Sequence, residues 1–310
     1  MISSIFGKTK PINYIILLTF LFVFYWIAVF LLFSTVYNPD DLMKQVFVLA
    51  ILLFNIFIIN FIVKRNKITA NHSFTILFFT LLIVLFPEIL LDNNAIFCSF
   101  FLLLAIRRLL SIKSLKLIKL KLFDATFWIV ISSFFYDWAL LYIVLVLITI
   151  YLYEPKNIRN WFVPIITLLT VLIITIGVLT IFNRLEFLEN HYTFSIGITA
   201  DYILKWESSL KLLSYILITL VLIVVTFIKL SKSGLGRINT MRLVTAFFII
   251  GLAVTFIKSS NEITPILLTF FPASVFISNY IEGIKRHNIK EMVLFSLLLI
   301  PFIVLFFRFN

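Results

Sequence analysis

Charged residues are scarce in this 310-residue sequence, where Asp, Glu, Lys and Arg together make up only 13%. A soluble domain carries about 25% charged and 45–50% apolar residues. Here hydrophobic residues reach 62%, with a mean hydropathy of +1.14. A chain of this composition cannot cover its surface for water, so lipid is its expected solvent. We therefore predict an all-α, polytopic integral membrane protein.

Cysteine and the familiar catalytic motifs are also nearly absent. Cys98 is the single cysteine, which excludes a disulfide within the chain and a thiolate metal site. The sequence has no Gly-rich phosphate loop and no Gly-x-Ser-x-Gly elbow. Its three histidines, His72, His191 and His287, are far apart. No residue is therefore predicted as a metal ligand, and the cofactor is left unknown, with a divalent metal as one possibility.

Basic residues exceed acidic ones, giving a net charge of +12. They occur as short clusters between apolar runs, which is the pattern of topology signals rather than of a nucleic-acid surface. We expect membrane lipids as partners and no nucleic acid.

Apolar runs separated by charge, Pro or Asn divide the whole chain. A span needs about 20 mostly apolar residues. We expect about eleven transmembrane helices in a single transmembrane domain, residues 1–310, without a soluble domain. The predicted spans are 12–35, 43–63, 70–91, 95–112, 122–136, 138–153, 161–183, 209–229, 240–257, 263–282 and 290–307.

The span count depends on the segment 122–153, which could be one helix or a hairpin. With a hairpin, most of the 26 basic residues fall on one side of the membrane and most of the 14 acidic residues on the other. The positive-inside rule favours that solution. It places the N-terminus in the cytoplasm and the C-terminus in the periplasm. Richness in Ile, Phe, Asn and Lys is typical of an AT-rich bacterial genome, so we expect the bacterial inner membrane.

Two segments are not predicted as spans. Residues 107–121 mix Lys and Arg with Leu and Ile, which favours an amphipathic helix on the cytoplasmic leaflet. The alternative is a loop that carries topology charges. Residues 183–208 form the longest outer stretch, and their aromatic side chains indicate an interfacial loop.

Asp40 and Asp41 are the first candidate site, because two adjacent carboxylates follow Asn38-Pro39 at the end of the first span. A carboxylate at a membrane surface can act as a general base or hold a divalent cation. The alternative is an ordinary helix start, where Pro and acids are favoured.

The second candidate site is a set of polar and aromatic residues at other outer loops, predicted to bind substrate. Glu88 lies at the membrane boundary, where ionisable groups are costly and often functional. Its spacing of four from Asp92 predicts that the two acids share one face of a continuing helix. Asp137 lies between Tyr136 and Trp138 at the hairpin tip, a combination that suits a sugar or lipid-linked ligand. Lys258 could bind phosphate. Each could instead belong to an interfacial belt or an ordinary loop.

Two stretches resemble the membrane part of the GT-C superfold of polyprenyl-phosphate-sugar glycosyltransferases, which includes protein mannosyltransferases and the lipid A aminoarabinose transferase. In one, two short helices with a polar tip lead to a basic turn, as in Phe123 to Trp138, Tyr142 to Tyr153 and Glu154 to Arg159. In the other, an Arg-led span precedes a Pro-containing span, as in Arg242 to Ser260 and Leu267 to Tyr280. The whole chain is also similar to a small bacterial membrane-protein family with no established activity.

The resemblance implies a GT-C-like helical scaffold with an acid of the first outer loop as the base or the metal-linked residue. Asp40 or Asp41 occupies the matching position. The chain departs from the pattern in its short first outer loop and in ending at Asn310 without the outer domain that many of these enzymes carry.

These observations lead to three hypotheses on function. The first is an enzyme that transfers a sugar from a polyprenyl-phosphate donor on the periplasmic face. The second is a non-catalytic accessory or scaffold subunit of a cell-envelope or secretion complex, with envelope protein partners. The third, a transporter or flippase, is disfavoured because no internal repeat is visible and charge within the spans is nearly absent.

Overall fold

The computed structural model describes residues 2–35, 38–196, 206–231, 233–258 and 265–309. The described residues form helices and no strand, as predicted. The α-helices are α1 Ile2–Phe6, α2 Pro11–Ile27, α3 Pro39–Asn66, α4 Phe74–Leu85, α5 Asn93–Ser111, α6 Ile118–Ser133, α7 Ile143–Tyr153, α8 Ile158–Ile181, α9 Glu186–His191, α11 Trp206–Leu230, α12 Leu235–Ile257, α13 Phe270–Glu282 and α14 His287–Phe309. Tighter or wider turns flank them: η1 Ala28–Leu32, η2 Pro87–Leu91, η3 Ile112–Ser114, η4 Asp137–Tyr142 and η5 Ile266–Thr269.

Seven helices of the described chain are long and apolar enough to cross a membrane. The protein is therefore a multi-pass membrane protein, although seven such helices are fewer than the eleven spans predicted. The seven are Pro11–Leu32, Asp41–Asn66, Asn93–Ser114, Ile158–Ile181, Leu210–Leu230, Leu235–Ile257 and His287–Phe307. The other four predicted spans coincide with shorter helical stretches, namely α4–η2, α6, η4–α7 and η5–α13.

The short helices are the buried ones. Nearly every residue of α4 is buried, as is most of α13. By contrast, α8 and α14 expose most of their apolar side chains, as expected of helices that face lipid. A helix enclosed by other helices needs no full bilayer length of its own, because its ends meet protein rather than lipid.

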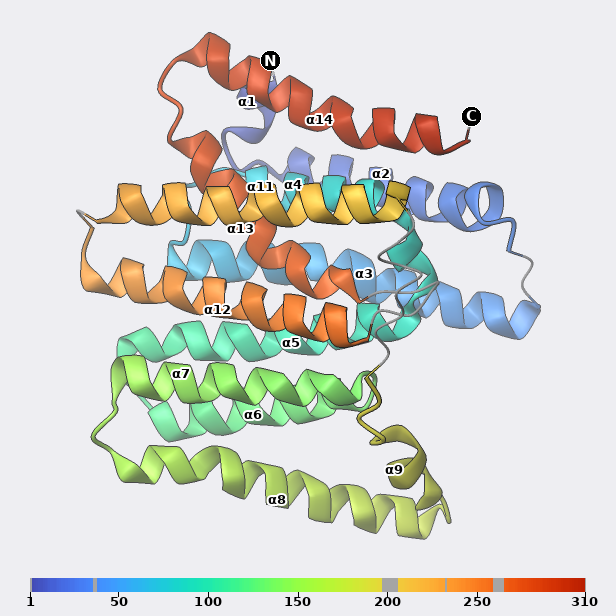
Figure 1. Ribbon diagram of the computed structural model, residues 1–310, viewed down its shortest axis with the longest axis vertical. Coiled ribbons are helices and arrows are strands. Elements are labelled where there is room, and N and C mark those ends of the chain that lie inside the picture. Colours follow the sequence, from blue (N-terminus) through green and yellow to red (C-terminus); the bar gives the residue numbers. More distant parts are fainter. Residues whose placement is uncertain (1, 36–37, 197–205, 232, 259–264, 310) are drawn as a thin grey trace.

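Successive helices alternate in direction, so the chain turns at two opposite ends of the bundle (Figure 1). The basic end holds the C-terminal ends of α3, α5, α7, α11 and α13. The acidic end holds the starts of α3, α5 and α11 and the turn between α6 and η4. The stretch 122–153 is two antiparallel helical pieces joined at Phe134–Tyr136, which confirms the predicted hairpin.

The predicted amphipathic helix over 107–121 is wrong. Arg107 and Arg108 belong to the last turns of α5, which continues into η3, and α6 begins at Ile118. Leu115 and Leu117 between them adopt positive φ angles of 53° and 51°. Left-handed backbone cannot lie within a right-handed helix, so the segment is a tight reversal between two membrane helices.

Gly251 fixes the packing of α12 against its neighbours. A Cβ at this position would lie 2.8 Å from the Tyr142 hydroxyl oxygen and 3.1 Å from a methyl carbon of Thr269. Both of those side chains are fully buried. The absence of a side chain at Gly251 therefore lets α12 approach η4 and η5 closely, as small residues do between membrane helices.

We expect Gly251→Val to destabilise the protein by roughly 1–3 kcal/mol, the usual effect of overpacking a buried contact. Thermal unfolding in an uncharged detergent measures the change. Gly177→Val is the matched control, because nothing lies within 4 Å of a Cβ at Gly177. Equal effects of the two substitutions would contradict this account of the α12 packing.

Candidate functional site

Asp137 and Lys258 form a buried ion pair at the acidic end. Asp137 is the first residue of η4, and Lys258 follows the last turn of α12. The Lys258 Nζ lies 3.0 Å from Asp137 Oδ1, and the Asp137 side chain is only 3% exposed. The Trp138 backbone N–H also donates to Oδ1, at 2.9 Å. The second oxygen, Oδ2, is buried and has no hydrogen-bond partner among the described residues.

A buried carboxylate oxygen without a donor is costly, at roughly 1–3 kcal/mol or more for a charged group. Such groups are rare and are found where a ligand, ion or water completes the site. Oδ2 of Asp137 is therefore the atom that identifies the hairpin tip as a candidate binding site.

Tyr136 and Asp92 extend the polar contacts from the hairpin tip to α5. The Tyr136 hydroxyl donates to Asp92 Oδ2. Asp92 also caps α5, because its Oδ1 accepts the Ala95 backbone N–H at 2.9 Å. Burial raises the pKa of the Asp92 carboxyl, and the hydrogen bond from Tyr136 partly offsets that rise.

The described part of the outer loop 183–208 folds over the hairpin tip. The Trp138 indole N–H donates to the Ser195 carbonyl at 3.1 Å, and Lys258 Nζ donates to Ser195 Oγ at 3.3 Å. Phe194 packs edge-on against Trp138, with ring centroids 5.5 Å apart. Tyr192 bonds the Ser133 hydroxyl at 2.8 Å. The described part of this loop rests on the protein and partly encloses Asp137.

Glu88 forms a second ion pair of the acidic end, with Lys211 of α11, at 2.8 Å between Oε1 and Nζ. The Lys211 Nζ also lies 4.7 Å from the Phe86 ring centroid. The sequence expectation that Glu88 and Asp92 share a helical face is wrong. α4 ends at Leu85, and the 3-10 turn η2 that begins at Pro87 separates the two acids.

Lys211 also lines an apolar cavity of about 490 Å³ between α4, α11, α13 and α14. Its walls are mostly aliphatic and aromatic, and Leu210, Ile218 and Ile300 in the lining are about half exposed. Exposed apolar residues of a membrane protein face lipid, so the cavity opens sideways to the bilayer. One charged group at its edge and apolar walls elsewhere suit a lipid tail with a polar head.

These linked contacts form one chain of polar residues, the acidic-end network. It runs from Lys211 through Glu88, along η2 to Asp92, across to Tyr136 and Asp137, and on to Lys258. All five residues predicted to bind substrate, Glu88, Tyr136, Asp137, Trp138 and Lys258, belong to it or touch it. Sequence reasoning did not single out Lys211 or Ser195 as site residues, because a polar side chain in or near the outer loop was their only local signal.

Asp41 is not part of the acidic-end network. It lies in the first turn of α3, where Lys44 Nζ approaches its Oδ1 to 3.3 Å, and both side chains are well exposed. Asp40 lies in the same turn, and its side chain is outside the described residues. The catalytic role of Asp40 or Asp41 stays a prediction. The described residues contain no group of three His, Cys, Asp or Glu side chains that could hold a metal ion.

The chain belongs to the DUF6427 family, described as a family of unknown function, whose model matches residues 16–310. No curated protein and no solved structure matches the chain. The match covers the chain from within α2 to the end of α14, including the acidic-end network.

We expect Lys258→Met to destabilise the protein by about 3 kcal/mol, because it leaves the Asp137 carboxylate buried without its counter-charge. Thermal unfolding in detergent gives the change. Removing both charges, with Asp137→Leu added, should recover much of the loss. The control Lys44→Met breaks an exposed pair and should change stability by less than about 1 kcal/mol. Similar effects of Lys258→Met and Lys44→Met would show that Asp137 does not depend on Lys258.

Proposed function

We propose that this DUF6427 protein is a small GT-C-like glycosyltransferase of the bacterial inner membrane. It would take a sugar from a polyprenyl-phosphate donor at the periplasmic face and pass it to a lipid, glycan or protein acceptor. The observation that carries the proposal is the continuity of an apolar cavity, open to the bilayer, with a buried network of carboxylates, cations and aromatic rings.

The two parts of the site match the two parts of such a donor. The cavity beside Lys211 would hold part of the isoprenoid chain, since a tail that enters sideways from the bilayer can pack against its apolar walls. Lys211 lies where the tail would meet the phosphate, and a Lys ammonium binds phosphate as a point charge. Trp138 offers an aromatic surface for a sugar ring, and the unpartnered Asp137 Oδ2 can accept a hydrogen bond from a sugar hydroxyl.

The transfer step forms one bond to the anomeric carbon and breaks another. The acceptor hydroxyl attacks the anomeric carbon, its C–O bond forms, and the bond from that carbon to the phosphate oxygen breaks. Polyprenyl phosphate leaves with the bonding electrons, and a carboxylate takes the acceptor proton. Asp40 or Asp41 is the proposed base, with a divalent metal as an added possibility, while Asp137, Glu88 and Lys258 orient the donor.

The proposed topology places the acidic end in the periplasm and the basic end in the cytoplasm. The short helical stretches α4–η2, α6, η4–α7 and η5–α13 then cross the membrane with the seven long helices, which makes eleven crossings. The N-terminus is cytoplasmic and the C-terminus periplasmic. The alternation of helix direction supports this assignment, since every turn with several basic residues falls at the basic end.

Single-cysteine labelling tests the orientation. The native Cys98 is fully buried and should not react, so an introduced cysteine reports alone. In spheroplasts, a membrane-impermeant maleimide should label Lys44→Cys at the acidic end and leave Lys285→Cys at the basic end unlabelled. Lys285→Cys should react only after the membrane is permeabilised. The reverse labelling pattern would overturn the proposed topology.

Substitution of the carboxylates tests the chemistry. We expect Asp137→Asn to abolish most sugar transfer, and Asp40→Ala or Asp41→Ala, whichever removes the base, to reduce it about 100-fold. The readout is the amount of glycoconjugate in cells whose membranes contain equal amounts of each variant.

Glu186→Ala is the matched control, because Glu186 is an exposed acid at the same end and belongs to no contact of the acidic-end network. Unchanged glycoconjugates in the Asp40, Asp41 and Asp137 variants would overturn the enzyme proposal. That outcome would favour the accessory or scaffold subunit, whose expected signature is a stoichiometric partner retained in mild detergent.

A further inference from the structure

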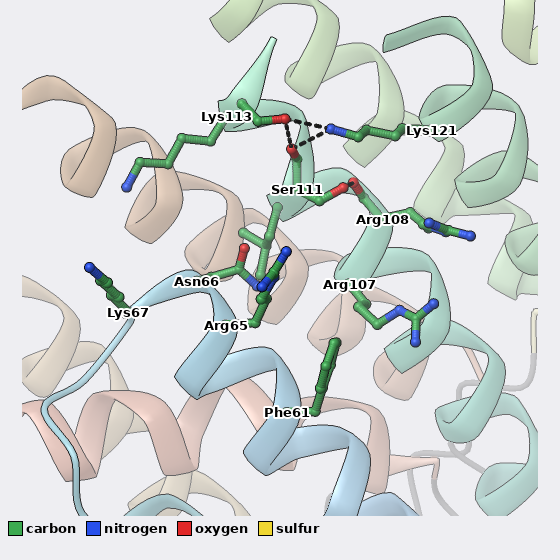
Figure 2. A pocket seen from close by; sticks show the side chains of 11 residues that line it. Phe61, Arg65, Asn66, Lys67, Arg107, Arg108, Ser111, Lys113 and Lys121 are labelled. Atoms are coloured by element: carbon green, nitrogen blue, oxygen red, sulfur yellow. Dashed lines mark hydrogen bonds between the residues drawn. The ribbon is translucent and has the colours of Figure 1, made fainter. Parts of the chain in front are cut away.

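A second cavity, of about 640 Å³, lies at the basic end between α3, α5 and the start of α6 (Figure 2). Six of its lining residues are cations, and no Asp or Glu lines it. The cations are Arg65, Lys67, Arg107, Arg108, Lys113 and Lys121. A volume of this size is typical of a small-molecule site.

Of the six cations that line this cavity, only Arg108 forms an ion pair with an acid among the described residues. Arg108 pairs with Asp124, at 3.0 Å between Nε and Oδ2. Within the part of the chain that the structure describes, none of the other five cations has an acid within 4.0 Å.

Several of these side chains are held in place. Lys121 Nζ donates to the Ser111 carbonyl and to Ser114 Oγ, each at 2.7 Å, as the dashed lines of Figure 2 mark. The Arg107 guanidinium lies over the Phe61 ring, 5.5 Å from its centroid. A cation–π contact and a carbonyl bond restrain the charges without neutralising them. The cations are therefore positioned before any ligand arrives.

Topology alone does not require this arrangement. The positive-inside rule asks only that Lys and Arg lie near the ends of spans, in any direction. Here Arg65 and Lys67 from the end of α3 line the same hollow as Arg107 and Lys113, which come 40 or more positions later in the sequence. Such convergence costs electrostatic energy unless an anion offsets it.

We infer that the basic-end cavity binds a phosphate group, either of an acidic phospholipid headgroup or of a free phosphate. Arg forks and Lys ammonium groups are the side chains that recognise phosphate oxygens. Leu115, Leu117 and Leu120 beside the cavity are exposed and apolar, which suits contact with the lipid leaflet. The site is separate from the acidic-end network and does not depend on the proposed transferase activity.

Lipid binding to the full-length protein in uncharged detergent tests the inference. Native mass spectrometry should show that phosphatidylglycerol binds and that phosphatidylcholine, whose headgroup carries its own cation, binds more weakly. The double variant Arg65→Gln/Lys113→Gln should bind phosphatidylglycerol about tenfold more weakly, because two charge-assisted contacts are lost. Lys285→Gln/Arg286→Gln removes the same two residue types from exposed positions at the same end, outside the cavity lining, and should bind as the wild type does.

A second variant distinguishes loss of the binding site from misfolding of the double variant. Lys67→Asn suits the left-handed backbone at that position, where φ is 51°. It should weaken binding several-fold while the unfolding temperature without lipid stays unchanged. Inorganic phosphate is tested in parallel by its effect on that temperature. Stabilisation by phosphate without lipid selectivity would identify a free phosphate as the ligand.

Three results would overturn the inference: binding of neither probe, wild-type binding by the cavity variants, or equal weakening by the Lys285/Arg286 control. The last of these would show a diffuse attraction of acidic lipid to the basic end rather than a site.

Discussion

Hydrocarbon offers no hydrogen-bond partner, and the whole arrangement of this protein depends on that constraint. The described backbone is helical almost throughout, since only helices and closed barrels satisfy their own peptide groups in lipid. Buried hydroxyls obey the same rule. The Thr255 hydroxyl, for example, donates to the Gly251 carbonyl one turn earlier, at 2.8 Å, and Thr126 bonds Leu122 in the same way at 2.9 Å.

The same constraint concentrates chemistry at the two ends of the bundle. Charges cannot stay unpaired in the hydrocarbon, so they collect where helices end, and neighbouring ends then bring distant residues together. At the acidic end the charges are paired and partly enclosed, as Asp137 with Lys258 and Glu88 with Lys211. At the basic end most of the cations that line the cavity have no acid within 4.0 Å among the described residues, with Arg108 paired to Asp124. The two ligands proposed above, a lipid-linked sugar and a phosphate group, correspond to these two environments.

Sequence reasoning succeeded where the signal was local. The all-helical class, the hairpin at Asp137 and the positions of the apolar segments followed from composition, hydropathy and the charge pattern. It failed at 107–121, because basic amphipathic character is shared by a surface helix and by two helix ends joined by a tight reversal. It also failed to separate Glu88 from Asp92, although Pro87 was visible, because a Pro can either kink a helix or end it.

Hydropathy and charge by themselves determined that this chain lies in a membrane, which segments are apolar and that their ends alternate between basic and acidic. Those properties belong to single residues and their neighbours, so a linear sequence holds them in full. Only the tertiary structure decided which polar groups meet. Tyr136 bonds Asp92 across 44 positions and Lys211 bonds Glu88 across 123. Such partners are chosen by how helices pack, and packing depends on the shapes of many side chains at once rather than on any local pattern.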